Sequence, residues 1–190
     1  QPDVFTYQEN GSSYHISTLA PTTHADLRLK RKSYKAVADL SFGMLGRTPD
    51  FINCALAAMA RNSHVLGKGD YADYSENAVN YYEKCRRNHL FIGHGAINPL
   101  IDRGIPLGSQ ENPYCGVRVV SYDSTGIIVS GAKMIVTLAP VADELLIFNM
   151  PGLVSGDEDY AVAFAVPVTA EGVKLICRKP LQHAGYSLYD

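Results

Sequence analysis

The sequence predicts an α+β fold in which a helical part comes first and a part made of short strands follows. Apolar residues recur at helical spacing up to about Asn88, whereas beyond Leu90 short β-branched runs alternate with turn signals. The chain has 190 residues, of which 46% are hydrophobic and 19% charged, so it can bury a core. We therefore predict a helical domain over residues 1–89 and a β-domain, a small barrel or sandwich, over residues 90–190.

The first helix is predicted over residues 24–44. Thr23 and Asp26 form a capping box, in which the Thr23 side chain accepts from the Asp26 backbone N–H and the carboxylate reaches back. Gly43 supplies the stop. We interpret the basic run at 28–32 as a solvated face of this helix and not as a binding patch.

Two more helices are predicted before residue 89. Thr48 as N-cap and Pro49 at the first helical position begin the second, and the third covers about residues 75–88. The expected inward positions are Ile52, Ala55, Leu56 and Met59 in the second helix, and Val79, Tyr82 and Cys85 in the third.

Six short strands are predicted in the second part, separated by turn signals. Their ranges are 117–122, 126–130, 134–138, 145–148, 160–168 and 173–178. Polar, strand-like stretches at the start and the lack of a capping element at the far end lead us to expect a piece of a longer protein.

Charge and cysteine usage narrow the class of protein. A net charge of −2 gives no electrostatic reason to expect nucleic acid or an anionic membrane as partner. No apolar run approaches the ~20 residues that span a bilayer. The four cysteines form no CxxC pair and lack zinc-type histidine spacing, so we expect no metal and interpret them as buried free thiols in the cytoplasm.

No self-contained catalytic motif stands out. A phosphate-binding loop, a GxSxG elbow and a GxGxxG fingerprint are missing, and the acidic triplet at 157–159 is typical of a solvated loop. Three polar residues in apolar settings remain as candidates. Spacing alone leaves ordinary roles open for them: a capping or surface arginine at Arg47, a hydrogen-bonded core histidine at His94, and a strand threonine at Thr137.

Three segments, collinear across almost the whole chain, carry a resemblance to a known family. They are FGMLGRTPDF at 42–51, YADYSENA at 71–78, and VSGAKM at 129–134 with ADEL at 142–145. The sequence resembles the oxygenase components of 4-hydroxyphenylacetate 3-monooxygenases. The resemblance implies an acyl-CoA dehydrogenase-like fold: an N-terminal helical domain that this chain covers in part, a central β-domain, and a C-terminal helical bundle that is absent from it. In the family the bundle completes the flavin site and the homotetramer.

The resemblance also implies the residues of the site. Arg47 and His94 match positions that contact the phenol. Phe51 stands where the family often has a tyrosine, so one hydrogen bond to the phenol or to its oxidised flavin partner is lost. Asn149 and Met150 match a loop that closes over the substrate. The positions that match flavin-contacting residues are His94, Gly95, Ala96, Ile97, Leu100, Ile101, Asp102, Arg103 and Thr137.

The implied reaction is the ortho-hydroxylation of a phenol such as 4-hydroxyphenylacetate. It uses O2 and FAD in its reduced form, FADH2, which a separate flavin reductase supplies; the lack of a nicotinamide-binding fingerprint is consistent with that division. A phenolate is the better nucleophile, and free phenols have a pKa near ~10. The charge of Arg47 lowers that pKa, and His94 hydrogen-bonds the phenol or accepts its proton.

Two other functions stay open. 4-Hydroxybutyryl-CoA dehydratase is a relative with the same fold, but its iron–sulfur cluster needs a closely spaced cysteine pair in the helical part, and Cys54 and Cys85 lie 31 positions apart. A non-catalytic subunit or fragment of the same fold is the second alternative. The presence of both Arg47 and His94 argues against it.

Overall fold

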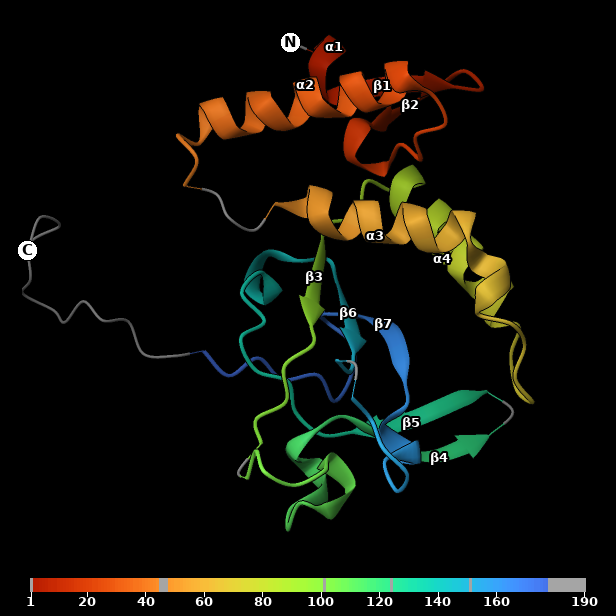
Figure 1. Cartoon of the computed structure of the whole chain (residues 1–190), viewed down its shortest axis with the longest axis vertical. Helices are drawn as coiled ribbons and strands as arrows, with labels where there is room; N and C mark the ends of the chain where they lie inside the picture. Colours follow the sequence, from red (N-terminus) through yellow and green to blue (C-terminus); the bar gives the residue numbers. More distant parts are fainter. Residues whose placement is uncertain (1, 45–47, 101, 124, 151, 178–190) are drawn as a thin grey trace, which may run out of the picture.

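The helices and the β1–β2 hairpin (residues 6–15) lie above two further small sheets (Figure 1). This computed structural model describes residues 2–44, 48–100, 102–123, 125–150 and 152–177. The first elements are α1 (Pro2–Phe5), β1 (Thr6–Glu9), β2 (Ser12–His15), α2 (His24–Leu40), α3 (Pro49–Arg61) and α4 (Tyr74–Arg87). The strands β3 (Ile92–Gly95), β4 (Arg118–Asp123), β5 (Gly126–Ser130), β6 (Glu144–Phe148) and β7 (Ala163–Pro167) follow. The predicted α+β class is confirmed.

Helix α2 begins where its capping box predicts but ends earlier than expected. Thr23 Oγ accepts from the Asp26 N–H (3.1 Å), and the Asp26 carboxylate accepts from the Thr23 N–H (2.9 Å). The predicted extension beyond Leu40 is wrong, because Phe42 adopts a left-handed φ of 51°. The N–H of Gly43 then donates to a carbonyl inside the helix (2.9 Å), which closes the helix in a Schellman motif.

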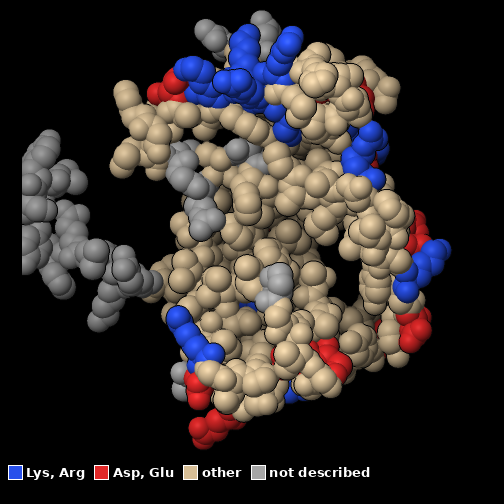
Figure 2. Space-filling model, in the orientation of Figure 1, with Lys and Arg blue, Asp and Glu red and all other residues tan. Residues whose placement is uncertain are grey.

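The basic run at 28–32 is only partly solvated. Basic side chains gather over α2 at the top of Figure 2, as predicted. Lys30 is buried instead, and its ammonium donates to the carbonyls of Ser17 (3.0 Å) and Leu19 (2.8 Å). The prediction is therefore wrong for Lys30, which anchors the turn before α2 against the helix.

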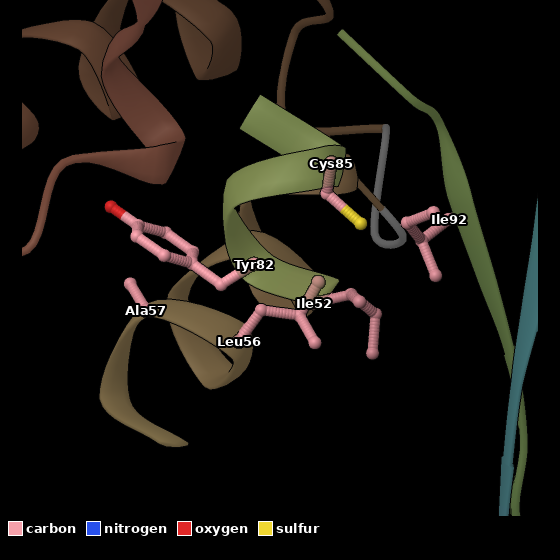
Figure 3. Close-up of a cluster of buried hydrophobic side chains, with 6 residues drawn as sticks. All are labelled: Ile52, Leu56, Ala57, Tyr82, Cys85 and Ile92. Carbon is pink, nitrogen blue, oxygen red and sulfur yellow. The ribbon is translucent and has the colours of Figure 1, made fainter. Parts of the chain in front are cut away.

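Helices α3 and α4 pack on strand β3 through one apolar cluster (Figure 3). Its buried members are Ile52, Leu56, Ala57, Tyr82, Cys85 and Ile92. The predicted inward positions of the two helices are confirmed except for Ala55, which is half-buried, and for Met59 and Val79, which are 38% and 37% exposed. The inward face of α3 is turned toward Asn53, whose amide donates to Ser17 Oγ (2.7 Å).

A hairpin of β1 and β2 makes the first part less purely helical than predicted. It docks on α4 through Arg86, whose guanidinium donates to the Glu9 carboxylate and to the Tyr7 hydroxyl (3.2 Å). The same guanidinium also pairs with Glu83 (3.0 Å) and lies 4.4 Å from the centroid of the Tyr14 ring. One half-buried arginine thus ties both ends of the helical part together.

The β-part contains one mixed sheet and one separate hairpin. Strand β6 lies between β3, to which it is parallel, and β7, to which it is antiparallel, while β4 pairs with β5. The strand predicted at 134–138 is wrong: Met134 forms a single bridge with Ile97, and Ile135 turns the chain with a φ of 59°. Residues 173–177, where the last strand was predicted, form no strand either.

Candidate functional site

Strands β3 and β6 bring the candidate residues to one edge of the sheet, the edge formed by the carboxyl ends of these two strands. They run parallel, with His94 opposite Leu146 and Gly95 opposite Ile147. The segments that follow them, residues 96–98 and 149–150, therefore leave the sheet at the same edge. Loops at the carboxyl ends of neighbouring parallel strands lie close together, which is why ligands often bind there.

His94 and Phe51 meet beside this edge. His94 is half-buried on β3, and Phe51 projects from the first turn of α3. Their ring centroids are 5.4 Å apart, with the rings tilted by 54°. The structure thus brings together two of the three residues expected at the phenol; Arg47, the third, lies outside the described residues.

Lys133 is the polar centre of the site, and the sequence did not single it out. Its half-buried ammonium donates to the Ala96 carbonyl (3.3 Å), to Asn98 Oδ1 (2.6 Å) and to Asn149 Oδ1 (2.6 Å). Burial lowers the pKa of Lys133 to about 8, because these three oxygens are neutral and bring no opposite charge. In the sequence its only signal is its place in the VSGAKM motif, since a lysine after a predicted strand is normally solvated.

Asn149 is held from both sides, as a residue with a fixed orientation must be. Its Oδ1 accepts from Lys133, and its Nδ2 donates to the Tyr160 carbonyl. Its neighbour Met150 is 52% exposed. The two residues predicted to form the substrate loop thus differ: one is anchored, and the other is open to solvent.

The segment after β3 runs beside the segment that contains Thr137. The Met134 N–H donates to the Ile97 carbonyl (2.9 Å), and Gly95 is packed so closely that an added Cβ would lie 2.9 Å from Ile147 and 3.3 Å from Val136. Ala96 is half-buried, whereas Ile97 and Thr137 are exposed. Several residues predicted to contact the flavin therefore lie in adjacent segments.

The other predicted flavin contacts lie further along the chain. Leu100 is half-buried, whereas Asp102 and Arg103 are exposed on a turn. Gln110 holds this turn, because its amide accepts from the Asp102 N–H (3.2 Å) and donates to the Asp102 carbonyl (2.5 Å). Ile101 lies outside the described residues.

Cysteines and acidic residues have structural places in the described chain. All four cysteines are free thiols; Cys85 and Cys115 are buried as predicted, while Cys177 is exposed and Cys54 half-buried. In the described ranges, no three His, Cys, Asp or Glu side chains are grouped to hold a metal ion, and no helix is long and apolar enough to cross a membrane. The acidic triplet is not wholly solvated, because Asp157 is buried and accepts from the Gly108 N–H (2.6 Å).

Curated relatives match nearly the whole chain. The 4-hydroxyphenylacetate 3-monooxygenase oxygenase component of Thermus thermophilus is 39% identical over 179 residues, which is 94% of this chain and 36% of that protein. The 4-nitrophenol 2-monooxygenase oxygenase component of a Rhodococcus species is 32% identical over 169 residues, or 89% of this chain and 31% of that protein. The chain thus spans about a third of the length of these relatives.

Solved structures and a family match agree with these relatives. The oxygenase component of 4-hydroxyphenylacetate 3-monooxygenase, in complex with FAD and 4-hydroxyphenylacetate, superposes with a TM-score of 0.79 at 38% identity, covering 89% of this chain and 34% of that one. An archaeal 4-hydroxybutyryl-CoA dehydratase from N. maritimus has a TM-score of 0.75 at 20% identity, over 89% and 34% of the two chains, which shows a shared fold alone. Residues 1–190 match the N-terminal region of the 4-hydroxyphenylacetate 3-hydroxylases. The chain therefore belongs to the 4-hydroxyphenylacetate 3-hydroxylase family and has part of its acyl-CoA dehydrogenase-like fold.

Proposed function

We propose that the protein acts as the oxygenase component of a two-component, flavin-dependent monooxygenase that hydroxylates a phenol ortho to its hydroxyl group. The observation that carries the proposal is the contact of the Phe51 ring with the His94 imidazole beside the edge of β3 and β6, in a chain whose relatives are oxygenase components. An aromatic wall next to an imidazole suits a phenol, because the ring packs against the wall while the phenol oxygen reaches a proton acceptor.

The residues around the edge fit FAD, which the related crystal structures contain. Ile97 and Ile135 expose apolar side chains (39% and 71%), which suits the flat flavin ring. Thr137 offers a hydroxyl nearby, and Arg103 offers an exposed guanidinium of the kind that pairs with phosphate. When bound in its reduced form, FAD supplies the electrons with which O2 delivers one oxygen atom to the substrate.

His94 holds the phenol oxygen and takes up its proton. An imidazole ring nitrogen can accept a proton, so His94 can serve as the base that turns the phenol into the more nucleophilic phenolate. The Phe51 ring lies beside the imidazole, with 5.4 Å between the ring centroids, and adds an apolar surface next to it. From the resemblance we assign to Arg47 the positive charge that lowers the pKa of the bound phenol from its usual value near ~10.

The proposed substrate is a para-substituted phenol of the 4-hydroxyphenylacetate type. The names of the relatives include 4-hydroxyphenylacetate and 4-nitrophenol enzymes, which share the phenol and differ in the group opposite to it. Asn149 and Met150 lie at the same edge as His94 and are the residues that we expect to contact the substrate. Phe51 lacks the hydroxyl that a tyrosine would offer there.

The proposed partners follow from the division of the reaction between an oxygenase and a separate reductase. A separate flavin reductase supplies the reduced FAD, O2 is the second substrate, and the full-length protein assembles as a homotetramer. We place the reaction in the cytoplasm, because the four cysteines are free thiols and a reducing compartment keeps them so.

The test uses the protein expressed from its whole gene. It is mixed without oxygen with reduced FAD and 4-hydroxyphenylacetate, oxygenated buffer is added, and the catechol product is measured by chromatography. We expect nearly one molecule of catechol to form for each molecule of reduced FAD that is oxidised. His94→Ala should form product at least a hundredfold more slowly, as is typical for the loss of a general base. Flavin oxidation at the rate seen without protein, with no catechol, would contradict the proposal and favour a non-catalytic subunit.

A further inference from the structure

We propose that Lys133 is a positioning residue of this site: its ammonium fastens Asn149 to the segment at 96–98 and so fixes the edge at which the phenol is held. The inference rests on the proposed function and deepens it. It starts from a contact between three segments that are distant in the sequence.

The hydrogen bonds of Lys133 show that it acts through its neighbours. A lysine ammonium has three N–H donors and no acceptor. All three are engaged, one each by Ala96, Asn98 and Asn149. No donor remains for a substrate oxygen or for a flavin, so Lys133 shapes the site and does not contact the reacting atoms.

Asn149 passes this constraint on to the 3-10 turn at Glu158–Tyr160, which precedes β7. Its Nδ2 donates to the Tyr160 carbonyl, and the Tyr160 hydroxyl donates to the Pro113 carbonyl (2.7 Å). The Tyr160 ring also lies 5.6 Å from the guanidinium of Arg118, and the residue is 2% exposed. One face of Asn149 is therefore tied to a rigid, buried tyrosine, and Lys133 holds the other face against β3.

The cost of this arrangement argues for a role in the site. In the part of the chain that the structure describes, no carboxylate pairs with Lys133, and burial holds its pKa at about 8. An ammonium in such surroundings destabilises the fold compared with an apolar side chain of the same length. Such local costs are typical of functional positions, where orientation matters more than stability.

The experiment compares four variants with the whole-gene protein: Lys133→Met, which keeps the length and removes the charge, Lys133→Arg, Asn149→Ala, and the Lys133→Met/Asn149→Ala double variant. The KM for 4-hydroxyphenylacetate and the catechol formed per flavin oxidised are measured for each. Hydrogen exchange of residues 96–98 and 148–150 is measured without flavin or substrate. Lys35→Met is the control, because this lysine is 74% exposed on α2.

We expect Lys133→Met to raise the KM about tenfold and to divert flavin oxidation toward hydrogen peroxide, as follows from losing one hydrogen bond from a charged group. Exchange should become faster in both segments, Lys133→Arg should restore part of the loss, and the double variant should be no worse than the worse single one. Unchanged KM, product yield and exchange in Lys133→Met, with an active wild type, would overturn this inference alone. A wild type that forms no catechol would overturn the proposed function and the inference with it.

Discussion

Phe51 shows how one atom in the site can set the preference for a phenol. Its ring lies 5.4 Å from the His94 ring and is 56% exposed, and we expect space for a hydroxyl at its tip. From the resemblance to the oxygenase family we expect a tyrosine at this position to reach a bound phenol with its hydroxyl. The difference between the two residues is thus one hydrogen bond, with the apolar wall unchanged.

Phe51→Tyr should therefore lower the KM for 4-hydroxyphenylacetate about fivefold, which corresponds to one neutral hydrogen bond of about 1 kcal/mol. Steady-state kinetics of the whole-gene protein would measure it. Phe42→Tyr is the matched control, because Phe42 is 91% exposed at the end of α2 and should leave the KM unchanged. A higher KM in Phe51→Tyr would mean that the substrate fills the space at the tip of the ring.

Lys30 should contribute more to stability than an exposed lysine of the same helix. Lys30→Met removes the ammonium that donates to the carbonyls of Ser17 and Leu19, and we expect a loss of about 2 kcal/mol in the free energy of unfolding. Lys35→Met removes an exposed ion pair with Asp39 and should cost no more than about 0.5 kcal/mol. Urea denaturation of both variants tests the difference; equal midpoints would show that the Lys30 contacts contribute nothing.

At the scale of elements, the sequence predicts what depends on neighbouring residues. The start of α2 was correct because Thr23 and Asp26 cap it locally. Its end was not, since the left-handed turn already begins at Phe42 (φ 51°), one residue before Gly43 (φ 73°). The strand predicted at 134–138 failed for a related reason: its β-branched run is bent at Ile135, and its one bridge depends on Ile97, far away in the sequence.

In the candidate site, too, the sequence predicts what depends on local motifs and misses what depends on distant contacts. His94 and Phe51 could be predicted through the family motifs, although their contact depends on how α3 packs against β3. Lys133 could not be found, because its burial is created by Asn98 and Asn149, which only the fold brings to it. Buried cations are invisible to patterns of local spacing, and Lys30 is a second example.

The end of α2 offers a direct test of this reasoning. Phe42 is left-handed, a conformation that costs a residue with a side chain roughly 1 kcal/mol compared with glycine. Since its ring is 91% exposed, little packing is lost on removing it. Phe42→Gly should therefore raise the free energy of unfolding by about 0.5 kcal/mol, whereas Ala38→Gly, at an exposed position within the helix, should lower it by about 1 kcal/mol. A loss of stability in Phe42→Gly would mean that the ring is packed in solution.

At the scale of the whole molecule, the helices meet the sheet through an apolar cluster and through polar contacts of charged side chains beside it. Ile92 of β3 belongs to the apolar cluster of α3 and α4. Beside it, Lys84 of α4 pairs with Glu144 at the start of β6, and the Phe91 N–H donates to Asp143 (2.7 Å). Since α3 and α4 share this cluster with β3, a titration at the junction should affect the unfolding of the helices and the sheet together.

Cys85 makes this coupling measurable. It is 2% exposed in the shared core, and burial raises the pKa of its thiol from the ordinary 9.0 to about 11. The unfolded chain loses this proton near pH 9 while the folded chain keeps it, so stability from this group is complete below pH 9 and is lost as the pH rises through about 11.

Lys133 acts in the opposite direction, because its pKa of about 8 lies below the ordinary 10.5, and its destabilising effect fades as the pH rises from 8 to 10.5. In the wild type, the free energy of unfolding should fall by up to about 2 kcal/mol at alkaline pH because of Cys85, and Cys85→Ala should remove this fall. Lys133→Met should make the free energy of unfolding fall more steeply with pH than in the wild type. Denaturation at pH 7, 9 and 10.5 measures both, and parallel pH curves for all three proteins would show that neither group is as buried in solution as in the fold described.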